Sequence, residues 1–311
     1  MNPKLRVKSF FSQCVSEWAA HYSDPEPRTL GSKNVRARQR FALKMVASAA
    51  PRGSKVLDVG CGTGEMAARL MELGYEVWGL DLSEAMIRHA RGRCRSDRFR
   101  VGDIEHIPFA DETFDAVVCL GVIEYLPTDE AALAEIWRVL KPGGSAVVST
   151  PSAVSPLHHM DRILAGVGPR ARAFYRLAVY RLRGRRSPVD HPSPLLTNRK
   201  YHPGSWLRLL RSSGFEPEEW ICHGWGWYRS ELGVLAGFLF HRAQSVHRVL
   251  ARCLGRMALG EVGERFVRNR ALNWLASEQI VRVRAIKSAA IRIAALWANL
   301  PDLLEVLAFV S

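Results

Sequence analysis

The part of the chain that decides the fold reads Lys55-Val56-Leu57-Asp58-Val59-Gly60-Cys61-Gly62-Thr63-Gly64. Its first half is mostly apolar and β-branched, which is typical of a buried strand, and its second half is a glycine-rich turn. A helical pattern follows from about residue 64 to residue 73. Glycines let a turn bend closely around a ligand, and open parallel sheets bind ligands at such turns. The stretch therefore predicts a ligand-binding turn between the first strand and the first helix of a sheet.

Strand and helix patterns alternate on both sides of this turn. Further strands are expected at 76–81, 99–102, 114–120, 145–150 and 216–223, and helices at 83–93, 128–140 and 206–213. Alternation of this kind builds a parallel sheet from strand–helix–strand units. We therefore predict an α/β fold with a Rossmann-like, doubly wound and mostly parallel sheet.

The spacing of the glycines restricts the ligand. A dinucleotide fingerprint needs glycine or alanine at position 65, whereas this chain has Glu65. An acid at the start of a helix disfavours a pyrophosphate, because two negative charges would meet there. Asp81 ends the second strand, where a carboxylate can accept hydrogen bonds from both hydroxyls of a ribose. Together these residues predict a nucleoside ligand without phosphates.

Five ordered segments carry a resemblance to a known family. They are Asp58–Gly64, Gly79-Leu80-Asp81, Gly102-Asp103-Ile104, Phe114–Leu120 and Arg138–Gly144. They resemble the successive motifs of class I S-adenosylmethionine-dependent methyltransferases. Within that superfamily the chain is similar to the type 11 group, which includes the ubiquinone and menaquinone biosynthesis methylases. The resemblance covers about a third of the chain and implies S-adenosylmethionine as the cofactor.

The resemblance also implies roles for single residues. Three glycines would cradle the methionine part of the cofactor, with a carboxylate near its ammonium: Gly60, Gly62, Gly64 and Asp58. The ribose would be held by Asp81, beside Leu82, and the adenine amine by Asp103 and the backbone of Ile104. Gly121 and Val122, just past the fourth strand, would flank the sulfonium.

The acceptor side of the chain departs from the quinone methylases. Those enzymes show Glu-His after the fourth strand, whereas this chain has Glu124-Tyr125. Tyrosine does not simply replace histidine in taking a proton, because its usual pKa is about 10, so a quinol acceptor is placed in doubt. His158, His159 and Tyr125 are the candidate catalytic residues, since a hydroxyl acceptor needs a base.

Composition restricts the class of protein. The six cysteines are scattered without a C-x-x-C pair, which argues against a structural metal site or a disulfide framework and favours a cytoplasmic protein. The N-terminus does not read as a secretory signal, and no stretch approaches the roughly 18 apolar residues of a membrane span. We expect three parts: a helical cap at 1–51, a methyltransferase domain at 52–230 with a basic insertion at 152–202, and a helical extension at 231–311.

The net charge of +14 is unevenly distributed along the chain. Residues 51–151 carry 11 basic and 16 acidic side chains, so the excess of positive charge lies in the flanks. The basic segments 162–186 and 271–300 suit peripheral contact with an anionic membrane, contact with nucleic acid, or helices that simply pack on the core. The leading hypothesis is O-methylation of a lipid-like, quinone-like or secondary-metabolite acceptor. The alternatives are an RNA or DNA methyltransferase and a catalytically silent scaffold at a membrane or on a partner.

Overall fold

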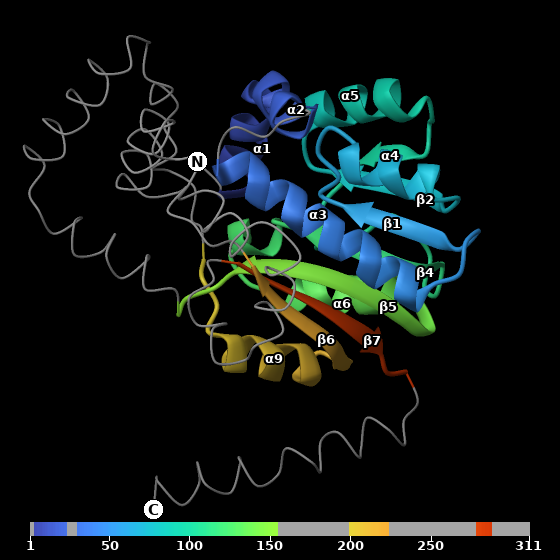
Figure 1. Ribbon diagram of the computed structural model, residues 1–311, viewed down its shortest axis with the longest axis vertical. Helices are drawn as coiled ribbons and strands as arrows, with labels where there is room; N and C mark the ends of the chain where they lie inside the picture. The colour runs from blue at the N-terminus through green and yellow to red at the C-terminus, as the bar shows by residue number, and fades with distance from the viewer. Residues whose placement is uncertain (1–2, 24–29, 155–198, 224–277, 288–311) are drawn as a thin grey trace, which may run out of the picture.

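A seven-stranded sheet forms the centre of the molecule in the computed structural model, which describes residues 3–23, 30–154, 199–223 and 278–287 (Figure 1). The strand order is β3-β2-β1-β4-β5-β7-β6. Pairing is parallel from β3 through β5, and β7 runs antiparallel to both of its neighbours. The predicted Rossmann-like, mostly parallel sheet is therefore confirmed.

The strands are β1 (Lys55–Val59), β2 (Glu76–Asp81), β3 (Phe99–Val101), β4 (Phe114–Leu120), β5 (Leu140–Pro151), β6 (Phe215–His223) and β7 (Glu278–Ala285). The helices are α1 (Pro3–Gln13), α2 (Val15–Ser23), α3 (Leu30–Ala49), α4 (Glu65–Glu72), α5 (Glu84–Cys94), α6 (Glu130–Val139) and α9 (Pro203–Ser212), with a short 3₁₀ turn η1 (Ile123–Tyr125).

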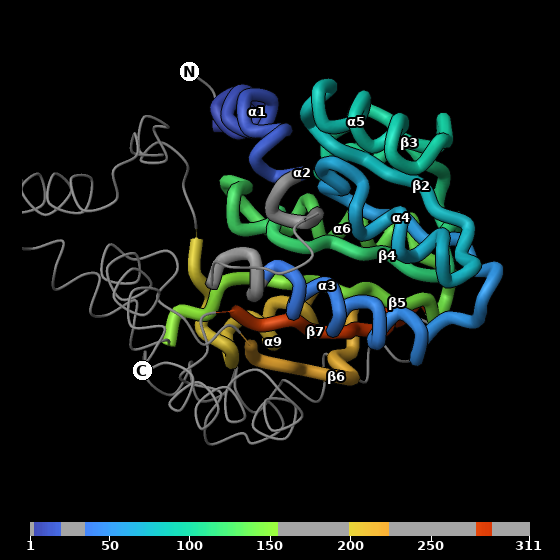
Figure 2. The backbone as a smooth tube through the Cα atoms, turned by 45° about the horizontal axis from the view of Figure 1, so that its top comes forward, coloured from blue at the N-terminus to red at the C-terminus, as the bar shows by residue number. Residues whose placement is uncertain are grey.

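Helices cover both faces of the sheet (Figures 1 and 2). Two apolar cores lie between these helices and the sheet. On one face α3, α4 and α5 bury residues such as Met45, Leu70 and Ile87 against the strands. On the other face α6 and α9 bury residues such as Leu133 and Trp206. Strands covered on both faces are apolar almost throughout, as the sequence of β4 already indicated.

The last described strand corrects one prediction. Residues from 231 onward were expected to be helical, but Glu278–Ala285 is strand β7, inserted between β5 and β6. The spacing of Ile280 and Val283 fits one face of a helix, which explains the error. The β-branched residues of this segment pack instead into both cores, with Ile280 on the α3 face and Val283 on the other. The extension therefore contributes to the central sheet.

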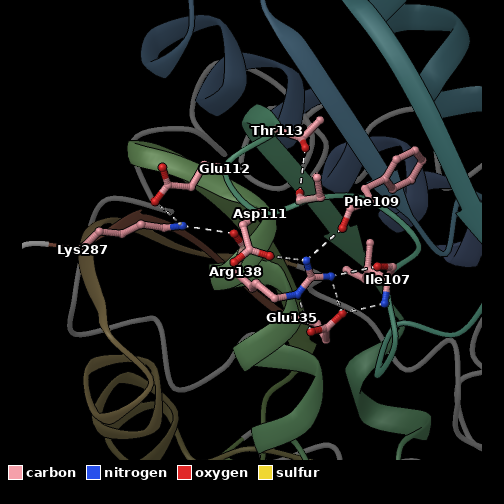
Figure 3. A network of polar contacts seen from close by, with 9 residues as sticks. Ile107, Phe109, Asp111, Glu112, Thr113, Glu135, Arg138 and Lys287 are labelled. Atoms are coloured by element: carbon pink, nitrogen blue, oxygen red, sulfur yellow. Dashed lines mark hydrogen bonds and ion pairs between the residues drawn. The ribbon is translucent and has the colours of Figure 1, made fainter.

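A cluster of polar contacts fixes the chain before β4 (Figure 3). The Arg138 guanidinium on α6 donates to both carboxylate oxygens of Glu135 and to the carbonyl oxygens of Ile107 and Phe109. It also pairs with Asp111 at 2.7 Å. These bonds hold the loop after β3 against α6, so Arg138, which begins the fifth of the resembling segments, stabilises the fold.

The basic insertion and the extension lie largely outside the described residues. Of the two basic segments, 162–186 is wholly outside, and 271–300 is described only at 278–287. Within the described ranges, no helix is long and apolar enough to cross a membrane.

Candidate functional site

A cavity opens at the carboxyl ends of β1, β2 and β4, where the sequence predicted the ligand. Ten of the predicted residues line it: Asp58, Gly60, Gly62, Asp81, Leu82, Asp103, Ile104, Gly121, Val122 and Tyr125. The other two candidate bases, His158 and His159, lie outside the described residues. Residues more than 60 positions apart in sequence thus meet at one site, as expected for the carboxyl edge of a parallel sheet.

Gly64 differs from the other predicted glycines. It does not line the cavity, and it precedes α4 with a φ of +85°. A Cβ at this position would lie 3.0 Å from the Cα of Ala90 on α5. Gly64 therefore lets α4 and α5 pack closely, and its contact with the cofactor stays a prediction.

The turn after β1 depends on Gly60 and Gly62 for two different reasons. Both have positive φ, +69° and +52°. A Cβ at Gly60 would lie 2.2 Å from Cγ2 of Val122, so the turns after β1 and β4 approach each other only over a glycine. A Cβ at Gly62 would meet no described atom within 4 Å. Gly60 thus closes the wall of the cavity, and Gly62 leaves space open beside it.

The Asp81 carboxylate is fixed by two backbone amides. Its Oδ2 accepts from the Gly62 N–H at 2.9 Å, and its Oδ1 accepts from the Ser83 N–H at 2.8 Å. Burial raises the pKa of Asp81, and these two hydrogen bonds oppose that rise. Each carboxylate oxygen accepts more than one hydrogen bond, so Asp81 can still receive two hydroxyls from the cavity. The geometry suits a ribose diol.

Asp58 is a buried acid that faces the same cavity. Its side chain is 3% exposed, and its Oδ2 has no hydrogen-bond partner in the described part of the chain. Burial raises the pKa of Asp58 to about 7, with further contributions from the charges of Asp81 and Glu65. Glu65 is itself held by Arg93 at 3.0 Å. A ligand cation placed beside Asp58 would supply the missing partner.

Helix α1, within the helical cap expected at 1–51, lies over one side of the cavity, but the sequence did not predict which of its residues line it. The Nζ of Lys4 is 2.5 Å from Oδ2 of Asp103 and also contacts Glu105. The hydroxyls of Ser12 and Ser83 are 2.8 Å apart. Lys4, Lys8, Phe11 and Trp18 all line the cavity. No contiguous motif signals these residues, because they reach the site only through tertiary packing.

The lining of the cavity also combines aromatic and charged residues. Phe11 packs edge-on against Tyr125, with ring centroids 5.5 Å apart. Arg38 of α3 lines the cavity, and its Nη1 is 3.7 Å from Oε2 of Glu278. The same carboxylate oxygen is 3.9 Å from Nε2 of His223. Burial lowers the pKa of His223 to about 4, so this imidazole is neutral near pH 7.

A second network holds the loop next to these groups. Asp129 pairs with Arg199 and accepts from the hydroxyl of Tyr201 at 2.8 Å. The backbone N–H of Arg199 donates to the carbonyl of Glu124 at 2.9 Å. The chain that returns from the insertion is thus tied to η1, beside the cavity.

Comparison with known proteins identifies the domain around this cavity. Residues 57–148 match the family model described as a methyltransferase domain. A malonyl-(acyl-carrier protein) O-methyltransferase of Erwinia pyrifoliae is 44% identical over 96 residues, which are 31% of this chain and 37% of that protein. A probable S-adenosylmethionine-dependent methyltransferase of Mycolicibacterium smegmatis is 38% identical over 103 residues, which are 33% of this chain and 40% of that protein. The chain therefore spans less than half the length of these two relatives.

A solved structure agrees in fold. The magnesium protoporphyrin IX methyltransferase of Synechocystis PCC 6803, determined with bound SAH, superposes with a TM-score of 0.56. The sequences are 15% identical, and the match covers 91% of this chain and 99% of that one. Residues 57–148 are therefore a methyltransferase domain, and they lie within the fold of class I S-adenosylmethionine-dependent methyltransferases.

Proposed function

We propose that this chain is an S-adenosylmethionine-dependent methyltransferase that methylates an oxygen atom of a small, acyl or lipid-like acceptor. The observation that carries the proposal is the Asp81 carboxylate, held by two amides at the cavity and able to accept a ribose diol. The matching methyltransferase domain covers the same residues.

The residues at the cavity fit the cofactor at both of its polar ends. Asp58 offers a buried oxygen without a hydrogen-bond partner among the described residues, which suits the ammonium of a methionine. Asp103 and the backbone of Ile104 lie beyond Asp81, where an adenine would follow the ribose. The bound cofactor supplies an electrophilic methyl group on sulfur. The chain contributes mainly alignment of the acceptor with that methyl, and alignment alone gives large rate enhancements.

The proposed acceptor class follows from the cavity wall and the relatives. Phe11, Trp18 and Tyr125 give the wall apolar rings that suit an acyl or other lipid-like group. The Erwinia pyrifoliae relative is named for methylating an oxygen of a malonyl group carried by a protein. An acyl group on a carrier protein is therefore a candidate acceptor.

The other hypotheses receive less support. The named relatives favour neither a nucleic-acid methyltransferase nor a silent scaffold. Membrane contact through 162–186 and 271–300 stays a prediction, because most of those residues lie outside the described part of the chain. A quinone-like acceptor also stays a prediction, with Tyr125 standing where the quinone methylases show histidine.

The test is methyl transfer from radiolabelled S-adenosylmethionine to three acceptors offered separately: a malonyl thioester, a reduced quinone and total RNA. We expect label in the thioester product with the wild-type chain and none with Asp81→Ala. Asp97→Ala removes an exposed carboxylate and should retain activity. Label in RNA alone, or equal activity of Asp81→Ala and wild type, would contradict the proposal.

A further inference from the structure

We propose that Lys8 of helix α1 binds an anionic group of the acceptor, either a carboxylate or a phosphate. The inference rests on the proposed function, because that function assigns Asp58, Asp81 and Asp103 to the cofactor and leaves the rest of the cavity to the acceptor. It adds to the site a residue that precedes the methyltransferase domain at 57–148.

Helix α1 places Lys8 at the middle of one side of the cavity. Residues three and four positions apart share a face of a helix, and the face of α1 that lines the cavity comprises Lys4, Val7, Lys8 and Phe11. At one end of this face Lys4 pairs with Asp103. At the other end Phe11 packs against Tyr125. Lys8 lies between these two contacts, about one helical turn from each.

Two serines hold this part of α1 in place. The hydroxyl of Ser12 donates to the backbone carbonyl of Lys8 at 2.7 Å and lies 2.8 Å from the hydroxyl of Ser83. Ser83 in turn caps α5 by accepting from the N–H of Met86 at 3.3 Å. The backbone at Lys8 is therefore tied to the loop after β2, which carries Asp81.

Lys8 differs from the other cations that line the cavity. Lys4 pairs with two carboxylates, and Arg38 lies beside the carboxylate of Glu278. The Nζ of Lys8 has no ion-pair partner among the residues that the structure describes. Its side chain is partly buried, so its charge is only partly solvated. An anionic ligand in the cavity would supply the opposite charge.

The proposed acceptor wall is next to Lys8. Phe11 is three residues further along the same face of α1, and its ring meets that of Tyr125. An acceptor that packs its apolar part against these rings can present a charged end to the ammonium. The acyl thioesters proposed above offer such a charge in two forms, the carboxylate of a malonyl group and the phosphate of a pantetheine arm.

Gln39 of α3 is a second polar residue at this cavity. Its side chain is 4% exposed, and its amide has no hydrogen-bond partner within the described ranges of the chain. Burying an amide without a partner costs free energy, which a polar ligand in the cavity would recover. The helices before β1 thus bring both an ammonium and an amide to the cavity, as expected for recognition of a polar acceptor.

The experiment is a calorimetric titration of the full chain, saturated with S-adenosylhomocysteine, with two pairs of probes. The first pair is the malonyl thioester of N-acetylcysteamine and its methyl ester, which differ in one carboxylate charge. The second pair is pantetheine 4′-phosphate and pantetheine. We expect the anionic member of at least one pair to bind about tenfold more tightly than its neutral partner, as for a charged hydrogen bond. The pair that shows this preference identifies the anion as carboxylate or phosphate.

Substitutions assign the preference to the ammonium. Lys8→Met should reduce it to less than about twofold, whereas Lys8→Arg keeps the charge and should retain most of it. Arg6→Met removes a cation from the same helix at a position that does not line the cavity, and should leave the preference unchanged. Gln39→Met should also keep the preference, because an uncharged amide does not distinguish the probes by charge. Loss of the preference in Gln39→Met but not in Lys8→Met would overturn the assignment.

The cofactor carries a carboxylate of its own, which a further comparison tests as the anion. S-adenosylhomocysteine has this carboxylate, whereas 5′-methylthioadenosine lacks it. Lys8→Met should bind each nucleoside as the wild-type chain does, which also shows that the variant is folded. Weaker binding of S-adenosylhomocysteine alone would place the cofactor carboxylate at Lys8 and overturn the proposal.

Equal binding within both pairs by the wild-type chain, or an unchanged preference in Lys8→Met, would also overturn the proposal. Failure of the wild-type chain to bind S-adenosylhomocysteine would instead overturn the proposed function, and the role of Lys8 with it. The two failures are distinguishable, because the first is observed only in a chain that binds S-adenosylhomocysteine.

Discussion

The two ends of the cavity are built in different ways. The proposed cofactor end uses Asp58, Gly60, Asp81 and Asp103, which follow one another within a single run of strands and turns. The opposite end brings Arg38 together with His223 and Glu278, from a helix and two strands far apart in the chain. The first end is fixed by local backbone geometry, and the second by tertiary packing. This difference predicts which substitutions damage the fold, the cofactor site or acceptor recognition.

The largest expected effect concerns the glycine turn. Gly60→Ala should lower the free energy of unfolding by about 2–5 kcal/mol, because positive φ and a clash with Val122 both cost energy. Gly62→Ala has only the positive φ and should cost about 1–2 kcal/mol. Denaturant unfolding measures both values. Equal losses would show that the close approach of the two turns does not govern stability.

The second effect concerns the Asp81 carboxylate. Asp81→Ala should weaken binding of S-adenosylhomocysteine about 100-fold, because it removes the proposed ribose acceptor and two hydrogen bonds that shape the turn. Calorimetry compares this variant with Asp97→Ala, which loses a negative charge elsewhere in the chain. The comparison separates the role of the Asp81 side chain from the general effect of losing a negative charge. A loss smaller than about fivefold would indicate that the ribose lies elsewhere.

The third effect depends on pH and on Asp58. Below a pKa of about 7 the carboxyl is protonated, so it loses its attraction for a ligand ammonium. The affinity for S-adenosylhomocysteine should therefore fall about tenfold between about pH 7.5 and about pH 6. Asp58→Asn should bind weakly and without this pH dependence. If the affinity of the wild-type chain for S-adenosylhomocysteine did not change with pH, the ligand ammonium would not be bound by the ionised Asp58.

Ionisation of the Asp58 carboxyl should also affect the free energy of unfolding when no ligand is present. This effect has the opposite sign, because the folded chain loses stability as the pH rises. Because burial raises the folded pKa above the unfolded value, ionising Asp58 costs stability as the pH rises toward about 7. Asp58→Asn should therefore gain stability relative to wild type as the pH rises through this range. Thermal unfolding of Asp58→Asn and of the wild-type chain at matched pH values measures their difference in stability. If that difference did not change with pH, the raised pKa of Asp58 would be contradicted.

The smallest expected effect concerns helix α1. Lys4→Met should weaken S-adenosylhomocysteine binding about threefold, because a partly exposed ion pair contributes at most about 1 kcal/mol. Arg6→Met removes the same charge from the same helix at a position that does not line the cavity, and should have no effect. Tighter binding by Lys4→Met would mean that Lys4 competes with the ligand for Asp103.

The sequence could predict which residues line one end of the cavity because the signals there are contiguous. The run from Lys55 to Gly64 contains strand, turn and helix start, and Asp81 ends the next strand. Gly64, in the same run, does not line the cavity and lies close to Ala90 of α5. Spacing alone does not distinguish a glycine beside a ligand from a glycine beside a helix.

The end of the cavity at Arg38 could not be predicted in the same way. Arg38 lies on a helix with abundant arginine, and only the position of Gly121 and Glu278 distinguishes it from the others. Strand β7 was missed because its apolar spacing also fits a helix, so its start at Glu278 beside β6 was not foreseen. Contacts between residues so distant in sequence leave no periodic pattern.

The central claim is that this cavity binds S-adenosylmethionine and no phosphorylated dinucleotide. Calorimetric titration of the purified chain with S-adenosylmethionine, S-adenosylhomocysteine and NADH tests it most directly. We expect micromolar binding of the first two, loss of that binding in Asp81→Ala, and no binding of NADH. A folded chain that binds neither sulfur nucleoside, or binds NADH at the same site, would contradict it.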